Sequence, residues 1–172
     1  GDSAPARRTE ISGPDTGFQL HDAVVAGRVE KVKGLVSQGA DINAATFSGK
    51  SALIFAVEEG HADIAEYLID HGAEVNAKTR SGRTPLLYSL NKKSEPVIVR
   101  LLQEGADIYA KDYRGETFLH LAAANAIPSI VKFLIENGAD MAVRDSGGYT
   151  PLHLSAYFGR VKTMRMLIDD AQ

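Results

Sequence analysis

The sequence contains no cysteine among its 172 residues. This absence excludes disulfide bonds, cysteine nucleophiles and zinc sites built on thiolates. A chain without cysteine is stable in oxidising and in reducing surroundings, so its compartment is left open. The sequence begins with Gly rather than Met. The localisation stays unknown: the cytoplasm is favoured, and export is the alternative if an upstream signal peptide has been removed.

Long apolar runs and an excess of charge of one sign are also missing. No stretch approaches the ~18 consecutive apolar residues of a membrane helix. The formal net charge is only −3, which argues against a nucleic-acid binder that works by neutralising phosphates. With 44% hydrophobic residues, the composition is typical of an ordered protein of about one domain. We therefore predict neither a membrane nor a nucleic acid as the partner.

Motifs of enzymes are absent as well. The sequence has no G-x-S-x-G, no P-loop and no dinucleotide-binding fingerprint. Its recurring polar residues are spread along the chain at intervals of 33 residues or multiples of 33, so they are not expected to converge on one site. They are His21, His120 and His153, and the acids Asp41, Glu74, Asp107 and Asp140. The sequence predicts no enzyme, no metal site and no cofactor.

What the sequence does have is a fixed period. Four glycines, Gly49, Gly82, Gly115 and Gly148, are spaced 33 residues apart. A second series with the same spacing, Gly39, Gly72, Gly105 and Gly138, is followed each time by Ala. Self-similarity at such a period indicates an architecture of stacked repeats.

Each period is predicted to form two helices and a turn. Thr150 followed by Pro151 is typical of a helix start, because the hydroxyl caps the helix and proline has no N–H to leave unpaired. The apolar stretch "PLHLSAYFG" then ends at Gly159, a residue suited to the left-handed conformation. A second amphipathic helix and an extended turn complete the unit. One unit cannot bury its own apolar faces, so the units must stack.

The motifs "TPLHLS", "TFLHLA" and "GHADIAEYLIDHGAEVNA" resemble the ankyrin repeat. The resemblance implies an all-α solenoid of stacked helix–turn–helix units with projecting β-turns. We predict a flexible N-terminal tail over residues 1–14, followed by an ankyrin repeat domain. Its five units span 15–45, 46–78, 79–111, 112–144 and 145–172.

Several residues differ from their equivalents in the other units, and each difference predicts a local structural feature. Asp22 occupies a position that is apolar in the other units, which suits a capping unit. Lys93 and Ala126 replace the glycine between the two helices of their units, so these turns should be less favourable. Thr163 and Arg165 either mark a C-terminal cap, or the array continues beyond residue 172. Both alternatives are left open.

The resemblance also bears on individual polar residues. It implies that His21, His120 and His153 are structural hydrogen-bonding residues near the start of the first helix of a unit. Asn43 and Asn76 resemble positions that an asparaginyl hydroxylase modifies in ankyrin segments. The alternative for these two residues is an ordinary turn asparagine.

In ankyrin arrays the turn tips and the first helices of the units form a concave face that commonly holds a protein partner. Carried over to this sequence, the pattern gives a set of candidate residues in which Tyr, Phe and Arg are frequent, as they are in interface anchors. The predicted partner-binding residues are Phe47, Lys50, Arg80, Arg83, Tyr113, Arg114, Glu116, Asn125, Tyr149, Tyr157 and Phe158.

We accordingly predict a monomeric, non-enzymatic protein–protein interaction module that binds a protein partner on its concave face. The basic candidates indicate an acidic element of the partner near the middle of the array. The aromatic candidates indicate an apolar anchor near its C-terminal end. The alternative is a targeting or regulatory arm of a larger protein whose activity lies in another domain.

Overall fold

The computed structural model describes residues 15–91 and 94–171, which contain ten α-helices and no β-strand. The helices are α1 (Asp15–Val25), α2 (Val29–Ser37), α3 (Ala52–Glu59), α4 (Ala62–Asp70), α5 (Pro85–Tyr88), α6 (Glu95–Gln103), α7 (Phe118–Ala124), α8 (Pro128–Glu136), α9 (Pro151–Tyr157) and α10 (Val161–Asp169). The predicted all-α class is therefore confirmed. The expectations for the tail over residues 1–14 and for the turn at Lys93 lie outside the described residues.

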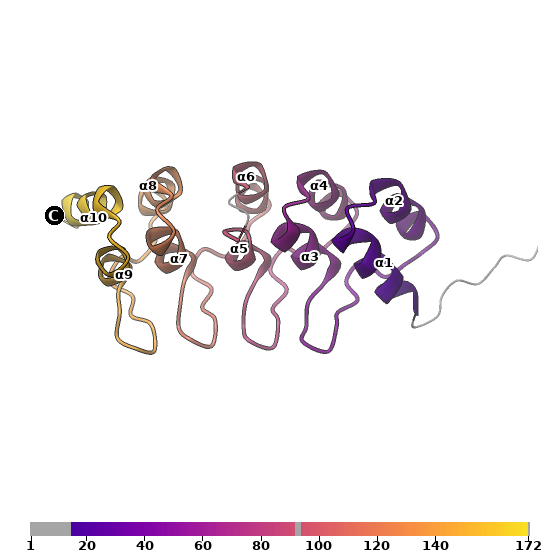
Figure 1. Ribbon diagram of the computed structural model, residues 1–172, viewed down its shortest axis with the longest axis horizontal. Coiled ribbons are helices and arrows are strands. Elements are labelled where there is room, and N and C mark those ends of the chain that lie inside the picture. Colours follow the sequence, from indigo (N-terminus) through magenta and orange to yellow (C-terminus); the bar gives the residue numbers. More distant parts are fainter. Residues whose placement is uncertain (1–14, 92–93, 172) are drawn as a thin grey trace, which may run out of the picture.

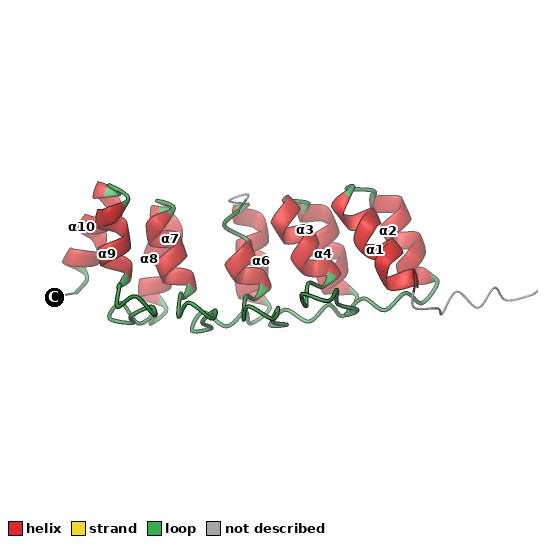
Figure 2. Cartoon of the chain, turned by 60° about the horizontal axis from the view of Figure 1, so that its bottom comes forward, coloured by secondary structure: helices red, strands yellow, loops and turns green. Residues whose placement is uncertain are grey.

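The helices form consecutive pairs that stack side by side in two layers (Figure 1). The outer layer consists of α2, α4, α6, α8 and α10, and the inner layer of α1, α3, α5, α7 and α9. The connecting loops project from the inner layer and run along one edge of the stack (Figure 2). We call the loop tips together with the exposed side of the inner helices the inner face.

One continuous apolar core runs through the stack. Leu20, Leu53, Leu86 and Leu119 lie in four successive inner helices and are almost fully buried. Asp22 is exposed, in accordance with a first unit that turns one side to water. Thr163, suggested as part of a C-terminal cap, is buried in α10 at the core position that Ile130 holds in α8, and both alternatives for the end of the array stay open.

The predicted threonine caps are present where a histidine follows three residues later. In α7 and α9, the threonine hydroxyl accepts the backbone N–H of His120 or His153, and the imidazole Nδ1 accepts the N–H of the threonine. At α5 the histidine is replaced by Leu87, and the buried hydroxyl of Thr84 finds no hydrogen-bond partner in the described part of the chain. The motif histidines thus add a second bond to the caps of α7 and α9, whereas Ser51 caps α3 without a histidine.

Ala126 occupies the turn between α7 and α8 with a φ of +53°, and it is the only non-glycine residue with positive φ in the described ranges. The equivalent residues Gly60 and Gly159 have φ of +77° and +67°. The predicted unfavourable turn is confirmed, because a side chain in this conformation approaches the backbone too closely.

Replacing Ala126 by Gly is expected to raise the free energy of unfolding by about 0.5–1 kcal/mol. The strain of a left-handed alanine, about 1–2 kcal/mol, outweighs the greater conformational entropy of glycine in the unfolded chain. The side chain is exposed, so no packing is lost. Urea unfolding measures the change. Ala156→Gly, at an exposed position inside α9, is the control and should destabilise; a loss of stability in both variants would contradict the strain argument.

The projecting loops are tied to one another through the backbone. The N–H groups of Arg80, Tyr113 and Ser146 each donate to a carbonyl of the preceding loop, at 2.9, 2.9 and 2.7 Å. The acceptors are Ser48, Ser81 and Arg114. These bonds hold neighbouring tips in register, so that side chains on successive tips form a row.

Candidate protein-interaction face

A hollow of about 540 Å³ lies on the inner face toward the C-terminal end of the stack. It is lined by Arg83, Arg114, Glu116, Leu121, Ala124, Asn125, Tyr149, Leu154, Tyr157 and Phe158. Seven of the eleven predicted partner-binding residues are brought together here. A smaller hollow of about 330 Å³ shares Arg83, Leu121 and Asn125 with it and extends it past α5.

Exposed aromatic rings form one end of the hollow. Tyr157, the last residue of α9, is 81% exposed, and its ring meets that of Phe158 edge to face at 5.0 Å. Tyr149, in the loop before α9, is half exposed. Apolar rings this open to water lose contact with solvent when a partner covers them, so they are suited to anchor an apolar side chain.

Two arginines occupy the other end. A terminal N–H of Arg83 donates to the Leu87 carbonyl at 3.0 Å, and its guanidinium lies over the Tyr88 ring at 4.6 Å. The Nε of Arg114 donates to the Tyr113 hydroxyl at 3.2 Å. A guanidinium has five N–H donors, so these contacts orient both groups and leave donors for a carboxylate.

Glu116 lines the hollow together with the two arginines and offsets part of their positive charge. Burial raises the pKa of its carboxyl, the neighbouring Asp112 adds to the rise, and the attraction of Arg114 opposes it. With Arg83 and Arg114 against one glutamate, the residues that line the hollow carry more positive than negative charge, which favours an acidic ligand.

Three further predicted residues lie on the loop tips outside the hollow. Phe47 is 84% exposed, and the guanidinium of Arg80 from the next loop lies 3.8 Å from its ring centre. Tyr113 on the third tip is 68% exposed. Together these side chains form a row of aromatic and basic groups that the backbone bonds between the loops keep in register.

Lys50, the remaining predicted residue, is held by contacts within the chain. Its ammonium group forms an ion pair with Glu58 at 2.8 Å and lies over the rings of Phe55 and Tyr88 at 5.6 and 5.3 Å. Lys50 is therefore paired inside the second unit with a residue eight positions along the chain, and its contact with a partner stays a prediction.

Leu121, Ala124 and Leu154 line the hollow but were not among the predicted residues. Leu121 and Leu154 sit at the position that Phe55 and Tyr88 hold in earlier units, and they are only partly buried. The 33-residue period that identified the aromatic candidates could also have identified Leu121 and Leu154. These two leucines line the hollow between the arginines and the aromatic rings.

The recurring histidines and asparagines serve the stack. The Nε2 of His120 is bonded to the Tyr149 carbonyl and that of His21 to the Ala44 carbonyl, both at 2.9 Å. The side-chain amide of Asn43 donates to the Gly72 carbonyl of the next unit, and Asn76 repeats this bond to Gly105. The structural role implied for the histidines is confirmed, and both alternatives for Asn43 and Asn76 stay open.

The described ranges contain neither a candidate metal centre nor a helix that could cross a membrane. No group of three or more His, Asp or Glu side chains there is arranged to hold a metal ion. None of the helices in the same ranges has the length and apolar character needed to cross a membrane.

Comparison with known proteins adds an independent result. A family model described as ankyrin repeats (3 copies) matches residues 20–112 and again residues 95–172. The chain is also similar to the Notch-regulated ankyrin repeat-containing proteins of Xenopus tropicalis and Homo sapiens, with 49% identity over 52 residues in each case. The match to the Notch-regulated ankyrin repeat-containing protein A of Danio rerio has the same identity and length. These matches cover 30% of this chain and 46% of each relative, so the chain spans less than half the length of the relatives that it matches.

Proposed function

Because the chain belongs to the ankyrin-repeat family, whose members generally mediate protein–protein interactions, we propose that it holds a protein partner on its inner, concave face. The observation that carries this proposal is the hollow in which seven predicted residues meet. The proposed ligand is a segment with an acidic side chain and, beside it, a large apolar side chain. The loop tips with Phe47, Arg80 and Tyr113 extend the contact along the stack.

Charge and exposure support this choice of ligand. Arg83 and Arg114 favour a carboxylate, and their planar groups suit bidentate bonds to it. Tyr157 and Phe158 provide apolar area that is open to water. Interfaces are enriched in Tyr, Phe and Arg, and a few such residues supply most of the binding energy.

The test is a pull-down from the native organism, followed by titration calorimetry with the captured partner. Changing Tyr157 and Phe158 to Ala is expected to weaken binding by about 2 kcal/mol, mainly through faster dissociation. Arg83→Glu combined with Arg114→Glu should weaken it as well and reverse the attraction of an acidic segment. Added salt should weaken the wild-type complex, since exposed charges are screened.

The outer helices provide matched controls. Glu66→Ala, Lys132→Ala and Arg165→Ala change exposed residues of α4, α8 and α10, and each should leave the affinity unchanged. If these substitutions abolish binding and those in the hollow do not, the partner binds elsewhere and the proposal is wrong, whereas the family assignment is unaffected.

A further inference from the structure

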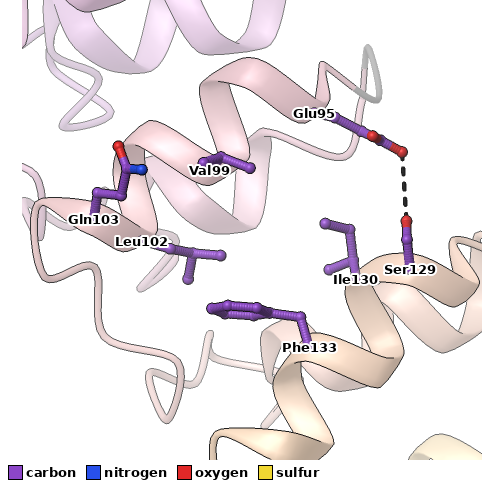
Figure 3. A pocket seen from close by; sticks show the side chains of 7 residues that line it. All are labelled: Glu95, Val99, Leu102, Gln103, Ser129, Ile130 and Phe133. Atoms are coloured by element: carbon purple, nitrogen blue, oxygen red, sulfur yellow. Dashed lines mark hydrogen bonds between the residues drawn. The ribbon is translucent and has the colours of Figure 1, made fainter.

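A second hollow, of about 370 Å³, lies between the outer helices α6 and α8, in the layer away from the loops. Val99 and Leu102 of α6 stand opposite Ile130 and Phe133 of α8 (Figure 3). Glu95, Gln103 and Ser129 provide the polar rim. We call this feature the outer groove. It shares no residue with the inner face.

The groove contains an apolar residue where the repeat otherwise places a charge. Val99 is 46% exposed. The residues one or more periods of 33 away are Lys33, Glu66, Lys132 and Arg165. Every other unit has a charged residue at this position on the outer surface. The exposed valine is therefore particular to the third unit.

The opposite wall lacks the ion pair that covers the preceding pair of outer helices. Between α4 and α6, Arg100 reaches the carboxylate of Asp70 and covers the space between the two helices with an ion pair. One period later, Phe133 stands in the place of Arg100 and Gln103 in the place of Asp70. The ion pair is lost, and Phe133 is left 40% exposed beside Leu102 and Val99.

The side of the groove toward α4 is acidic, whereas α10, beyond α8, carries Lys162 and Arg165 against Asp169. Helices α4, α6 and α8 carry five acidic side chains, Asp63, Glu66, Asp70, Glu95 and Glu136, against two basic ones, Arg100 and Lys132. Arg100 is held between Asp70 and Glu104, and Lys132 lies 3.8 Å from Glu136. The Glu95 carboxylate at the rim accepts only the Ser129 hydroxyl, at 3.4 Å, from the described residues (Figure 3).

We propose that the outer groove docks an amphipathic helix of a partner protein, one with apolar residues on one face and Lys or Arg beside them. Each wall offers two apolar residues three positions apart, which is the spacing that meets the apolar face of a third helix. The described residues offer no sheet edge to which an extended segment could add. The basic side chains of the partner lie against Glu95 and Glu66, so this partner has the opposite charge to the ligand of the inner face.

Two synthetic peptides test the proposal with the full chain. The first is a fluorescein-labelled helical peptide of Ala, Leu and Lys with Leu at positions i, i+3, i+4 and i+7. The second has Glu in place of every Lys. Fluorescence anisotropy should detect binding of the Lys peptide and at least tenfold weaker binding of the Glu peptide, about 1.4 kcal/mol at 25 °C.

Variants of the chain locate the site. Val99→Lys and Phe133→Arg introduce side chains that other units carry at the equivalent positions, as Lys33 and Arg100 do, so the fold should be retained. Circular dichroism and the thermal midpoint check this. Each substitution is expected to lower the affinity for the Lys peptide about tenfold. Lys132→Ala, on the same helix as Phe133, is the matched control and should bind as the wild type does. The inner-face variant Tyr157→Ala, Phe158→Ala should also bind normally.

Three results would overturn the proposal. The first is equal affinity for the Lys and Glu peptides, since the groove would then not select a basic helix. The second is unchanged binding by Val99→Lys and Phe133→Arg. The third is a wild-type protein that sediments as a dimer while Val99→Lys sediments as a monomer, because the groove would then accommodate a second copy of this chain.

Discussion

Replacing His120 by Ala is expected to lower the free energy of unfolding by about 3 kcal/mol. The imidazole is fully buried and connects two units. Its Nδ1 accepts the Thr117 N–H at 3.2 Å, and its Nε2 is bonded to the Tyr149 carbonyl at 2.9 Å. Alanine would leave a cavity and a buried N–H without a partner. Urea unfolding monitored by circular dichroism measures the loss. His153→Ala is the control and should cost less, because His153 forms the same cap in the last unit but is exposed.

The same imidazole should make stability depend on pH. Burial lowers the pKa of His120 below its ordinary value of about 6.5, and the bond to the Tyr149 carbonyl opposes this only in part. As the pH falls below about 6.5, the unfolded chain binds a proton that the native chain excludes, so native stability falls. Protonated Nδ1 could not accept the Thr117 N–H. The stability difference between the wild type and His120→Ala should therefore shrink from pH 7.5 to 5.5, and a constant difference would contradict this assignment.

Replacing Gly49 by Ala is expected to cost about 3 kcal/mol, whereas Gly105→Ala should cost only about 1 kcal/mol. Both glycines have positive φ, +86° and +84°, so both variants carry the strain of a left-handed alanine. At Gly49 a Cβ would also lie 2.9 Å from the Cα of Thr79 in the next loop. At Gly105 it would meet nothing within 4 Å.

The difference between the two glycines isolates the contact between loops. Thr79 and Arg80 would have to move away from Gly49, and the bond from the Arg80 N–H to the Ser48 carbonyl would weaken. Urea midpoints of both variants, with Gly39→Ala as a second open position at φ +91°, measure the effect. Equal losses in all three variants would mean that backbone strain alone accounts for the cost and that the loops do not restrain one another.

Much of the fold could be predicted because the signals are local. Thr150 before Pro151 begins a helix, and Gly60 and Gly159 end one, through conformations of a few neighbouring residues. The 33-residue period then implies that such units stack, since none can bury its apolar side alone. Even the unfavourable turn at Ala126 followed from a missing glycine. These inferences need no knowledge of which side chains meet across units.

The features that depend on contacts between side chains, within a unit or across units, emerged only from the packed stack. Lys50 is at a predicted binding position, yet it pairs with Glu58. The Thr84 hydroxyl, at a predicted cap, is buried without a partner among the described residues. The hollow of the inner face and the outer groove both form where side chains a full period apart come together. The sequence could therefore establish the repeat and the candidate rows. Which charges stay unpaired, and where apolar surface stays exposed, depends on side-chain contacts within and between units, which tertiary packing alone determines.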